Sequence, residues 1–369
     1  MRVAFLTPEV IPAYGWARYG VDLAYALGRQ RVEVVAVTQR GSLPPDAAHL
    51  LADVRPVLPQ LYPPVRGFLA RSLLALPQTR RAVADCDLVH VIAEPYTPLG
   101  ALVGGRRPLV VTAHGTYVPM TARRRLVGGL YRRAYCRAAL IAVSRYTAEQ
   151  VQSALPGVDP VVIHNGVHYD QFQLPADCPP EKTGPVVLAT GGVKERKGTH
   201  MLVAALARVV QQVPDVQLVV TGGQEPAYLA RLQSQIARLG LADRVLLPGH
   251  VTQCELLGWY QSADVFALPS QNVGQKFEGF GLVFLEAGAC GLPVIGTTGS
   301  GVEEAVIDGE TGLLVPQDDA DALADAIVRL LTDRALHQRL GTAGREHARQ
   351  QDWSHIAERV QAFYGQILG

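Results

Sequence analysis

The chain has 369 residues, of which 48% are hydrophobic and 18% are charged, as in an ordinary globular protein. This length exceeds one ordinary hydrophobic core and predicts two domains. The longest apolar runs are far shorter than the ~20 residues that a membrane-spanning helix needs, so no such helix is expected.

The formal net charge is only +1, but the charges are unevenly distributed. Residues 1–170 contain 19 Arg and no Lys against 11 acidic residues, an excess of +8. The remainder contains 15 basic and 22 acidic residues, an excess of −7. This asymmetry has two interpretations: a composition that favours arginine throughout, or a first half that meets an anion or an anionic surface.

Short apolar runs alternate with longer amphipathic patterns along the chain, in two successive cycles. Continuous apolar strands separated by helices indicate parallel sheets that are covered on both faces. The predicted fold class is therefore α/β, with two Rossmann-like, doubly wound parallel-sheet domains facing each other across a cleft. The predicted strands are residues 2–7, 32–37, 87–93, 108–114, 140–144 and 161–166 in the first cycle, and 185–192, 216–223, 244–250, 264–270, 292–297 and 311–315 in the second.

Composition sets the expected domain boundary. Residues 168–185 are rich in Pro and Asp and lack periodicity, which is typical of an interdomain linker. They separate a first domain over residues 1–170 from a second over residues 185–350. Residues 354–369 form one more amphipathic helix, with Ser354 as its N-cap, which we expect to pack back on the first domain.

Five cysteines are scattered singly and in an odd number: Cys86, Cys136, Cys178, Cys254 and Cys290. This usage favours reduced thiols over a disulfide or zinc framework. The first residues already have the pattern of a buried strand, which leaves no room for a secretion signal, so a cytoplasmic location is expected. Two D-x-D matches, at residues 85–87 and 319–321, begin a strand and a helix, where acids have local roles, so no metal site is predicted.

A glycine-rich, basic loop follows the first strand of the second cycle. Residues 191–198, GGVKERKG, carry Lys194, Arg196 and Lys197 at a strand's carboxyl end, where open parallel sheets bind ligands. Such a cluster is often a solvated surface, but at this position its cations suit a diphosphate. The chain lacks G-x-x-x-x-G-K-[ST], and no G-x-G-x-x-G follows its first strand, which disfavours a P-loop nucleotidase and a standard dinucleotide dehydrogenase.

Two carboxylates interrupt the otherwise apolar residues 276–297, KFEGFGLVFLEAGACGLPVIGT. Withdrawing an ionised carboxylate from water without a partner costs roughly several kcal/mol, so Glu278 and Glu286 are expected to bind something specific. Gly281 and Leu282 open a helix after Glu278 and offer backbone donors. Glu286 lies in the second turn of that helix among apolar neighbours, where a vicinal diol is an attractive partner.

His114 ends a predicted strand and precedes a glycine, in VVTAHGTY. It can donate a hydrogen bond to a ligand, although a lone histidine is more often a packing residue. In the same way, Trp16, Tyr19 and Tyr117 can stack on a sugar or a base, or simply pack in the core.

Together these features resemble the retaining glycosyltransferases of family 4, which have the GT-B fold, and the resemblance extends over nearly the whole chain. EGFGLVFLEAGACGLPVIGT is similar to the Glu-x7-Glu signature of that family. Other segments that resemble family landmarks are AVSRYT at 142–147, HNGV at 164–167, LPS at 268–270 and GVEEAVIDGETGLLV at 301–315.

The resemblance implies metal-independent, retaining transfer of a sugar from a nucleotide-diphosphate sugar to an acceptor hydroxyl, in glycan, glycolipid or polysaccharide biosynthesis. The first domain would receive the acceptor and the second would bind the donor. No cofactor is implied, because the nucleotide sugar is a substrate, and no nucleic-acid partner is implied either. A sugar-nucleotide epimerase or hydrolase is the alternative, and a non-catalytic binder of sugar nucleotides is a third.

Carried over to this sequence, the resemblance implies that Glu286 binds the ribose hydroxyls and that Glu278 lies by the donor sugar. Arg196 and Lys197 would bind the diphosphate, and His114 would lie against the reacting sugar. Catalytic roles are implied for His114, Glu278, Arg196 and Lys197. The other donor-binding residues implied are Gly15, Gly192, Gly249, His250, Val251, Gly279, Phe280, Gly281 and Leu282.

Three departures from the family pattern concern this site. Trp16 follows Gly15 where many relatives have a second glycine. Gly192 stands where many relatives have an arginine, a charge that Arg196 beside Lys197 would supply. The segment QNVGQKF, residues 271–277, is longer than in many relatives and would shape the donor or acceptor pocket.

Two arginine-rich segments, residues 66–81 and 121–137, concentrate the positive charge of the first domain. Both place apolar residues at helical spacing between the arginines. This pattern suits an anionic or lipid-linked acceptor and peripheral association with the inner face of the membrane. It also describes a helix that packs on a sheet with its arginines in water, so both interpretations stand.

Overall fold

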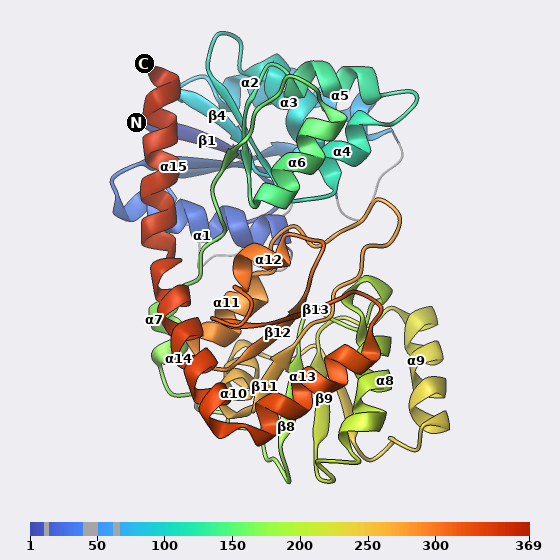
Figure 1. Ribbon diagram of the computed structural model, residues 1–369. Coiled ribbons are helices and arrows are strands. Elements are labelled where there is room, and N and C mark those ends of the chain that lie inside the picture. The colour runs from blue at the N-terminus through green and yellow to red at the C-terminus, as the bar shows by residue number, and fades with distance from the viewer. Residues whose placement is uncertain (11–14, 40–50, 62–66) are drawn as a thin grey trace. The chain divides into compact units, whose positions relative to one another are not determined.

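A computed structural model describes residues 1–10, 15–39, 51–61 and 67–369, and the chain divides into two compact units (Figure 1). The first unit comprises Met1–Asn165 and Trp353–Gly369, and the second comprises Gly166–Asp352. Each unit has its own parallel sheet with helices around it. The predicted α/β class with two parallel-sheet domains is therefore confirmed.

The first unit is built on a parallel sheet whose described strands follow the order β3-β2-β1-β4-β5-β6-β7. Strand β3 lies at one edge and was not among the predicted strands, because it contains Pro56 and partly exposed residues instead of an apolar run. The strands are β1 (Arg2–Leu6), β2 (Glu33–Gln39), β3 (Asp53–Leu58), β4 (Leu88–Val91), β5 (Leu109–Ala113), β6 (Ala139–Ala142) and β7 (Val161–Val162).

Helices cover both faces of this sheet. Alternate residues of β1 point to two separate cores: Phe5 packs with Tyr19 of α1 and Trp353 of α15, whereas Leu6 packs on the other face with Tyr135 of α5. The helices are α1 (Gly15–Arg29), α2 (Phe68–Ala82), η2 (Glu94–Tyr96), α3 (Thr97–Val103), α4 (Tyr117–Ala122), α5 (Gly128–Tyr135), α6 (Arg145–Ala154) and α15 (Trp353–Leu368).

A buried polar contact joins the C-terminal helix α15 to the sheet. His90 of β4 places Nδ1 2.6 Å from the hydroxyl oxygen of Tyr364 and Nε2 2.7 Å from Oγ1 of Thr112. Burial lowers the pKa of His90 to about 3, so the ring stays neutral in the fold. The helix that ends the chain is thus part of the first unit.

The second unit contains a parallel sheet in the order β10-β9-β8-β11-β12-β13. Residues from β8, β9, α8, α9 and α13 form the core on one of its faces. The strands are β8 (Val186–Ala189), β9 (Gln217–Thr221), β10 (Val245–Gly249), β11 (Val265–Ala267), β12 (Val294–Thr297) and β13 (Gly312–Val315). The helices are α7 (Tyr169–Gln173), η3 (Glu195–Lys197), α8 (Thr199–Val209), α9 (Pro226–Arg238), α10 (Gln253–Ser262), α11 (Leu282–Ala289), α12 (Val302–Ala305), α13 (Ala320–Thr332) and α14 (Arg334–Gln350).

Residues 168–185, expected to form an interdomain linker, belong instead to the second unit, because the division falls after Asn165. Residues Tyr169–Gln173 of this segment form helix α7, and side-chain contacts hold the irregular remainder in place. Lys182 Nζ, for example, donates to Asp264 Oδ2 at 2.8 Å. Composition gave no sign of helix α7 or of these long-range contacts.

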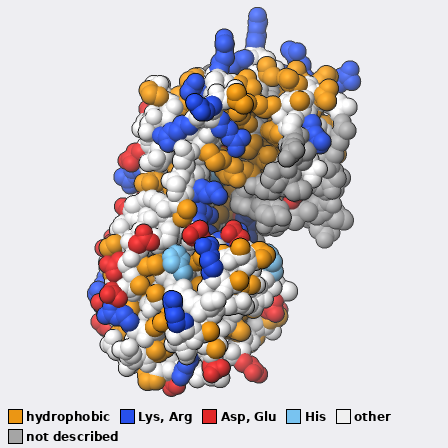
Figure 2. All heavy atoms as spheres, turned by 90° about the vertical axis from the view of Figure 1, so that its right-hand side faces the viewer, with side chains coloured by type: hydrophobic (Ala, Val, Ile, Leu, Met, Phe, Trp, Pro, Cys, Tyr) orange, Lys and Arg blue, Asp and Glu red, His pale blue; other side chains and the backbone are white. Residues whose placement is uncertain are grey.

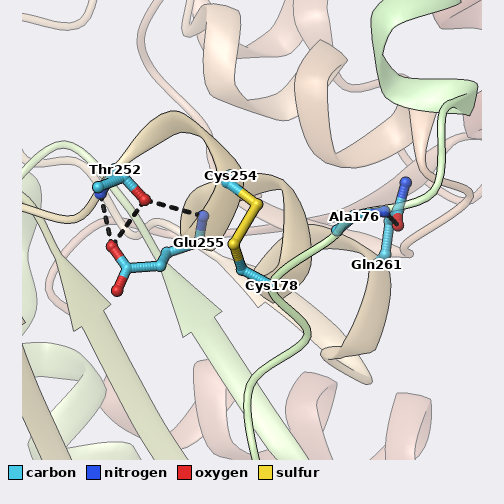
Figure 3. Close-up of a disulfide and its surroundings, with 6 residues drawn as sticks. All are labelled: Ala176, Cys178, Thr252, Cys254, Glu255 and Gln261. Carbon is cyan, nitrogen blue, oxygen red and sulfur yellow. Dashed lines mark hydrogen bonds between the residues drawn. A yellow bond between two sulfur atoms is a disulfide. The ribbon is translucent and has the colours of Figure 1, made fainter.

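The same segment is tied to α10 by a disulfide between Cys178 and Cys254, whose Cα atoms are 5.8 Å apart (Figure 3). The prediction of reduced thiols was therefore wrong for these two residues. They are 76 positions apart in the sequence, so no local spacing of cysteines indicated the disulfide. Cys86, Cys136 and Cys290 are free thiols.

Candidate functional site

The basic loop of the second unit lies between β8 and α8 and depends on glycines for its path. Gly192 has φ 95°, and a Cβ on it would lie 2.3 Å from the carbonyl oxygen of Gly223 in the loop after β9. Gly198 has φ 66°, and its Cβ would lie 1.9 Å from the carbonyl oxygen of Pro269 after β11. Only glycine fits such close approaches, which bring the cations of η3 against the next loop of the sheet edge.

Glu278 lies at the centre of a compact charged cluster in this unit. Its Oε2 accepts hydrogen bonds from Arg196 Nη1 at 2.8 Å, Lys197 Nζ at 2.7 Å and Ser270 Oγ at 3.2 Å. The Glu278 and Lys197 side chains are only 13% and 12% exposed. The structure therefore brings together three predicted site residues and adds Ser270, which we had noted only as part of a resemblance.

Two opposing effects act on the pKa values in this cluster. Burial alone would raise the pKa of Glu278, but the charges of Lys197 and Arg196 and their hydrogen bonds lower it to about 2. Burial lowers the pKa of Lys197, and the nearby Glu278 carboxylate opposes that effect. The carboxylate is thus ionised at neutral pH and neutralises part of the positive charge.

Glu286 lies on α11 and is held by a residue that sequence reasoning missed. The buried Tyr260 of α10 donates its hydroxyl to Glu286 Oε2 at 2.8 Å. The same hydroxyl lies 3.2 Å from Oγ1 of Thr190, at the end of β8. In the sequence Tyr260 is typical of a core residue, and no signal pointed to its polar contacts.

The loop after β10 carries three more of the predicted residues, Gly249, His250 and Val251. The carbonyl oxygen of Gly249 accepts the backbone N–H of Gly222 at 2.7 Å, which joins this loop to the one after β9. Because β9 lies between β10 and β8, all three loops line the carboxyl edge of one sheet. Gly279, Phe280, Gly281 and Leu282 lie at the start of α11, whose N-cap is Gly281.

In the first unit, two contacts fix His114 directly after β5. Its backbone N–H donates to Glu94 Oε1 at 2.9 Å, and its ring Nε2 lies 3.0 Å from the carbonyl oxygen of Ile92. A carbonyl oxygen can only accept, so Nε2 carries the proton. Although the ring is partly exposed, the protein packed around it lowers the pKa of His114 to about 4. The neutral ring thus keeps Nδ1 as an acceptor.

Other predicted residues of the first unit have differing surroundings. Gly15 begins α1 and is exposed, with no atom within 4 Å of the place where a Cβ would lie. Trp16 and Tyr19 are buried, and Trp16 packs against Tyr117 with ring centroids 4.5 Å apart. Packing is thus the role that the structure shows for these aromatic rings. Gly15 and His114 lie in one unit, and the Glu278 cluster lies in the other.

The acids of the two D-x-D matches have partners within the protein, although those of the first match are distant in sequence. The two carboxylate oxygens of Asp85 lie 2.6 and 2.9 Å from the guanidinium nitrogens of Arg55. Asp319 is the N-cap of α13. Across residues 1–10, 15–39, 51–61 and 67–369, no group of three or more His, Cys, Asp or Glu side chains could hold a metal ion. In the same part of the chain, no helix has the length and apolar character needed to cross a membrane.

Comparison with known proteins adds two family matches that together cover most of the chain. Residues 14–171 match the model described as Glycosyltransferase Family 4, and residues 170–347 match Glycosyl transferases group 1.

Individual proteins agree with these matches. A GDP-mannose-dependent alpha-(1-6)-phosphatidylinositol monomannoside mannosyltransferase of Mycolicibacterium smegmatis is 34% identical, over 73% of this chain and 74% of that protein. A D-inositol 3-phosphate glycosyltransferase of Xylanimonas cellulosilytica is 31% identical, over 99% and 96%. Among solved structures, the sucrose-phosphate synthase of Thermosynechococcus elongatus superposes with a TM-score of 0.82 at 27% identity, covering 100% of this chain and 99% of that one.

Proposed function

Since this chain belongs to glycosyltransferase family 4, with the GT-B fold, we propose that it transfers a sugar from a nucleoside-diphosphate sugar to an acceptor hydroxyl with retention of configuration. The observation that carries this proposal is the cluster in which Arg196 and Lys197 converge on the carboxylate of Glu278, whose side chain is only 13% exposed. Two cations at the carboxyl edge of a parallel sheet suit a diphosphate, and a carboxylate between them suits sugar hydroxyls.

The chemical demand of such a transfer is a stable leaving group. As the bond from the anomeric carbon to the diphosphate breaks, negative charge builds up on the phosphate oxygens. Arg196 and Lys197 would stabilise that charge together with the N–H groups that begin α11, so no metal ion or other cofactor is required. The acceptor hydroxyl attacks the same face that the diphosphate leaves, which keeps the anomeric configuration.

The remaining donor contacts follow from the positions of the predicted residues. Glu286, oriented by Tyr260, would accept hydrogen bonds from the ribose hydroxyls. Gly249, His250 and Val251 would flank the base. In the first unit, we assign Gly15 to the diphosphate and His114 to the reacting sugar.

The relatives suggest which substrates to test first. The mycobacterial relative is named for GDP-mannose and a phosphatidylinositol monomannoside. We therefore propose GDP-mannose as the first donor and an anionic, lipid-linked inositol glycan as the first acceptor class.

The surface of the first unit supports an acceptor at an anionic membrane. Arg123, Arg124 and Arg125 are exposed beside Leu126, which is 99% exposed. On α2, Leu74 is 82% exposed. Figure 2 shows basic side chains among hydrophobic ones over the part of the first unit that carries α2 and α5. We call Arg71, Leu73, Leu74, Arg123, Arg124, Arg125, Leu126, Leu130, Arg132 and Arg133 the arginine–leucine patch; residue 66, the first of the predicted basic segments, lies outside the described residues.

A donor and acceptor panel tests the proposed function. GDP-mannose, UDP-glucose and ADP-glucose are compared for thermal stabilisation, and the best donor is incubated with lipid extracts that contain phosphatidylinositol glycans. We expect a glycosylated product with the donor's anomeric configuration, and little product from Arg196→Ala. Release of nucleotide without an acceptor supports the hydrolase or epimerase alternative. Donor binding without turnover under every condition supports a non-catalytic binder.

A further inference from the structure

Glu94 has no role in the proposed function so far, yet it is a carboxyl group with 0% exposure. It begins η2, in the loop that follows β4, and its side chain contacts His114, the first residue after the neighbouring strand β5. Burial raises the pKa of Glu94 to about 7, although the backbone N–H of His114 and the nearby Trp16 side chain oppose this shift. Burying an acid lowers the stability of the fold unless hydrogen bonds compensate for the lost contact with water. The hydrogen bonds of Glu94 therefore indicate its role.

The hydrogen bonds between β5 and β6 end just before His114, and Glu94 then accepts the next N–H of the chain. The ladder between β5 and β6 ends with the pair Ala113 and Ala142. His114 is the first residue beyond it, and Gly115 then turns with φ 138°. The N–H of His114 therefore has no strand partner in this ladder, and the Glu94 carboxyl accepts it at 2.9 Å.

A second contact from the same segment fixes the ring. Ile92, two residues before Glu94, accepts from Nε2 of His114 at 3.0 Å. Ile92 is itself anchored, because its N–H donates to the carbonyl oxygen of Leu6 in β1 at 3.0 Å. The rings of Tyr19 and His114 pack nearly perpendicular to each other with centroids 4.6 Å apart. The segment from Ile92 to Glu94 thus holds one residue at two points, its backbone and its ring.

We propose that Glu94 is a positioning residue for His114: its carboxyl holds the His114 backbone while Ile92 holds Nε2, so that Nδ1 is presented as a hydrogen-bond acceptor to a hydroxyl of the reacting sugar. The last clause rests on the proposed function, whereas the positioning of His114 does not. The required property of residue 94 is a hydrogen-bond acceptor of the right length, not a negative charge.

Two variants separate these requirements. Glu94→Gln keeps an acceptor for the His114 N–H and cannot ionise, and Glu94→Met fills a similar volume without a comparable acceptor. Asp22→Ala removes another buried acid of the first unit, on α1, and serves as the matched control. Nitrogen NMR of histidine-labelled protein reports the tautomer and titration of His114, assigned with His114→Gln, and steady-state kinetics with GDP-mannose report catalysis.

We expect the His114 resonance to show the Nε2-protonated tautomer in the wild type, Glu94→Gln and Asp22→Ala, and a mixture of tautomers in Glu94→Met. The kcat of Glu94→Met should fall about 10-fold or more, with the KM for the donor changed less than about 3-fold, while Glu94→Gln stays close to the wild type. An unchanged tautomer in Glu94→Met overturns the proposal, even if activity is lost. The proposal is also overturned if Glu94→Gln does not show the Nε2-protonated tautomer of the wild type. If the wild type transfers no sugar, the proposed function fails, and the resonance alone still decides whether Glu94 positions His114.

Discussion

One oxygen of Glu278 receives hydrogen bonds from Arg196, Lys197 and Ser270, and this crowding has a consequence for the release of product. When Arg196 or Lys197 turns from Glu278 to the diphosphate, the carboxylate loses a hydrogen bond. The hydroxyls of the transferred sugar would replace that hydrogen bond. A free nucleoside diphosphate brings no such hydroxyls. Glu278 therefore competes with the product for both cations and should weaken product binding.

Glu278→Gln should consequently bind GDP about 10-fold more tightly, which corresponds to about 1.4 kcal/mol, while sugar transfer falls. Calorimetry at pH 6.5 measures the affinity under conditions that favour a protonated Lys197, whose pKa burial lowers. Glu346→Gln removes one exposed acid elsewhere in the same unit and should leave GDP binding unchanged. Equal or weaker GDP binding by Glu278→Gln would contradict the competition.

Tyr260 offers a separate test of the ribose contact. Tyr260→Phe removes the donor to Glu286 Oε2 and leaves the ring in the core. A neutral-to-charged hydrogen bond of this kind is worth about 1.5–3 kcal/mol, and part of it should appear as a 3- to 10-fold loss of nucleotide affinity. The control is Tyr228→Phe, whose hydroxyl contacts His200 in the same unit. If both variants bind GDP like the wild type, Tyr260 does not orient a nucleotide ligand.

These residues also mark what the sequence could predict about the site. Arg196, Lys197 and Glu278 follow β-strands at their carboxyl ends, and parallel topology alone brings such residues to one edge. Glu94 and Tyr260 act through hydrogen bonds to residues 20 and 26 positions away. Those contacts depend on side-chain direction in the finished fold, which no local pattern encodes.

At the scale of elements, β4 and α15 meet at a buried histidine, which makes the first unit sensitive to acid. His90 and His114 have ordinary pKa values of 6.5, lowered in the fold to about 3 and 4. Between pH 6.5 and 4.5 the unfolded chain therefore binds two protons there that the folded unit does not. Glu94 opposes them, because its pKa of about 7 in the fold exceeds the ordinary 4.5. The unfolded state gains a net proton, so stability falls as the pH drops.

The expected loss is about 1.4 kcal/mol per pH unit in this window. Urea unfolding followed by pulse proteolysis measures it for the first unit at pH 6.5, 5.5 and 4.5. His90→Gln keeps polar contacts to Tyr364 and Thr112 but cannot titrate, so its stability should be nearly level across the window. His355→Gln, an exposed position on α15, should behave like the wild type. A slope that survives His90→Gln unchanged would assign the acid sensitivity to other groups.

A second element-scale prediction concerns the segment that we expected to be a linker. The disulfide between Cys178 and Cys254 ties it to α10, and removing a native disulfide typically costs about 2–5 kcal/mol. Cys178→Ser with Cys254→Ser should lower the melting temperature of the second unit by several degrees without abolishing its fold, since Lys182 still pairs with Asp264. A reductant should reproduce the shift in the wild type but not in the double variant. Cys136→Ser, an exposed free thiol, is the control.

The elements that sequence reasoning found and missed differ in one physical respect. The predicted strands of both cycles are apolar runs, and most of them lie between other strands, where burial on both faces leaves a strong signal; β7, β10 and β13 lie at edges but keep an apolar run in the sequence. Strand β3 lies at an edge and is partly exposed, and residues 174–185 are irregular backbone held by side chains. Neither has a periodic pattern, because neither buries a continuous face.

At the scale of the whole molecule, the two parts of the chain carry opposite net charges, and we propose that each part serves a different partner. The negative part contains the proposed donor site, where Arg196 and Lys197 supply positive charge locally. Several exposed arginines of the positive part belong to the arginine–leucine patch, which is far in sequence from any donor-binding residue of the second unit. This excess of positive charge has no part in the proposed binding of the nucleotide sugar. It therefore points to a separate anionic partner.

The last prediction tests whether that partner is a membrane. Vesicles containing phosphatidylinositol should sediment the protein at low salt, because each basic residue near an anionic surface is worth roughly 1 kcal/mol. Binding should weaken as the Debye length shortens from ~10 Å at 0.1 M salt to ~3 Å at 1 M. Arg123→Glu with Arg124→Glu should reduce it strongly, and Leu126→Ser should reduce it at low salt as well, since that side chain is 99% exposed. The matched control, Arg29→Glu with Arg359→Glu, changes the same total charge on α1 and α15, which cover the opposite face of the sheet. If the control weakens sedimentation as much as the patch variant does, only net charge matters; if the wild type ignores anionic vesicles at low salt, the arginines of the patch are simply solvated.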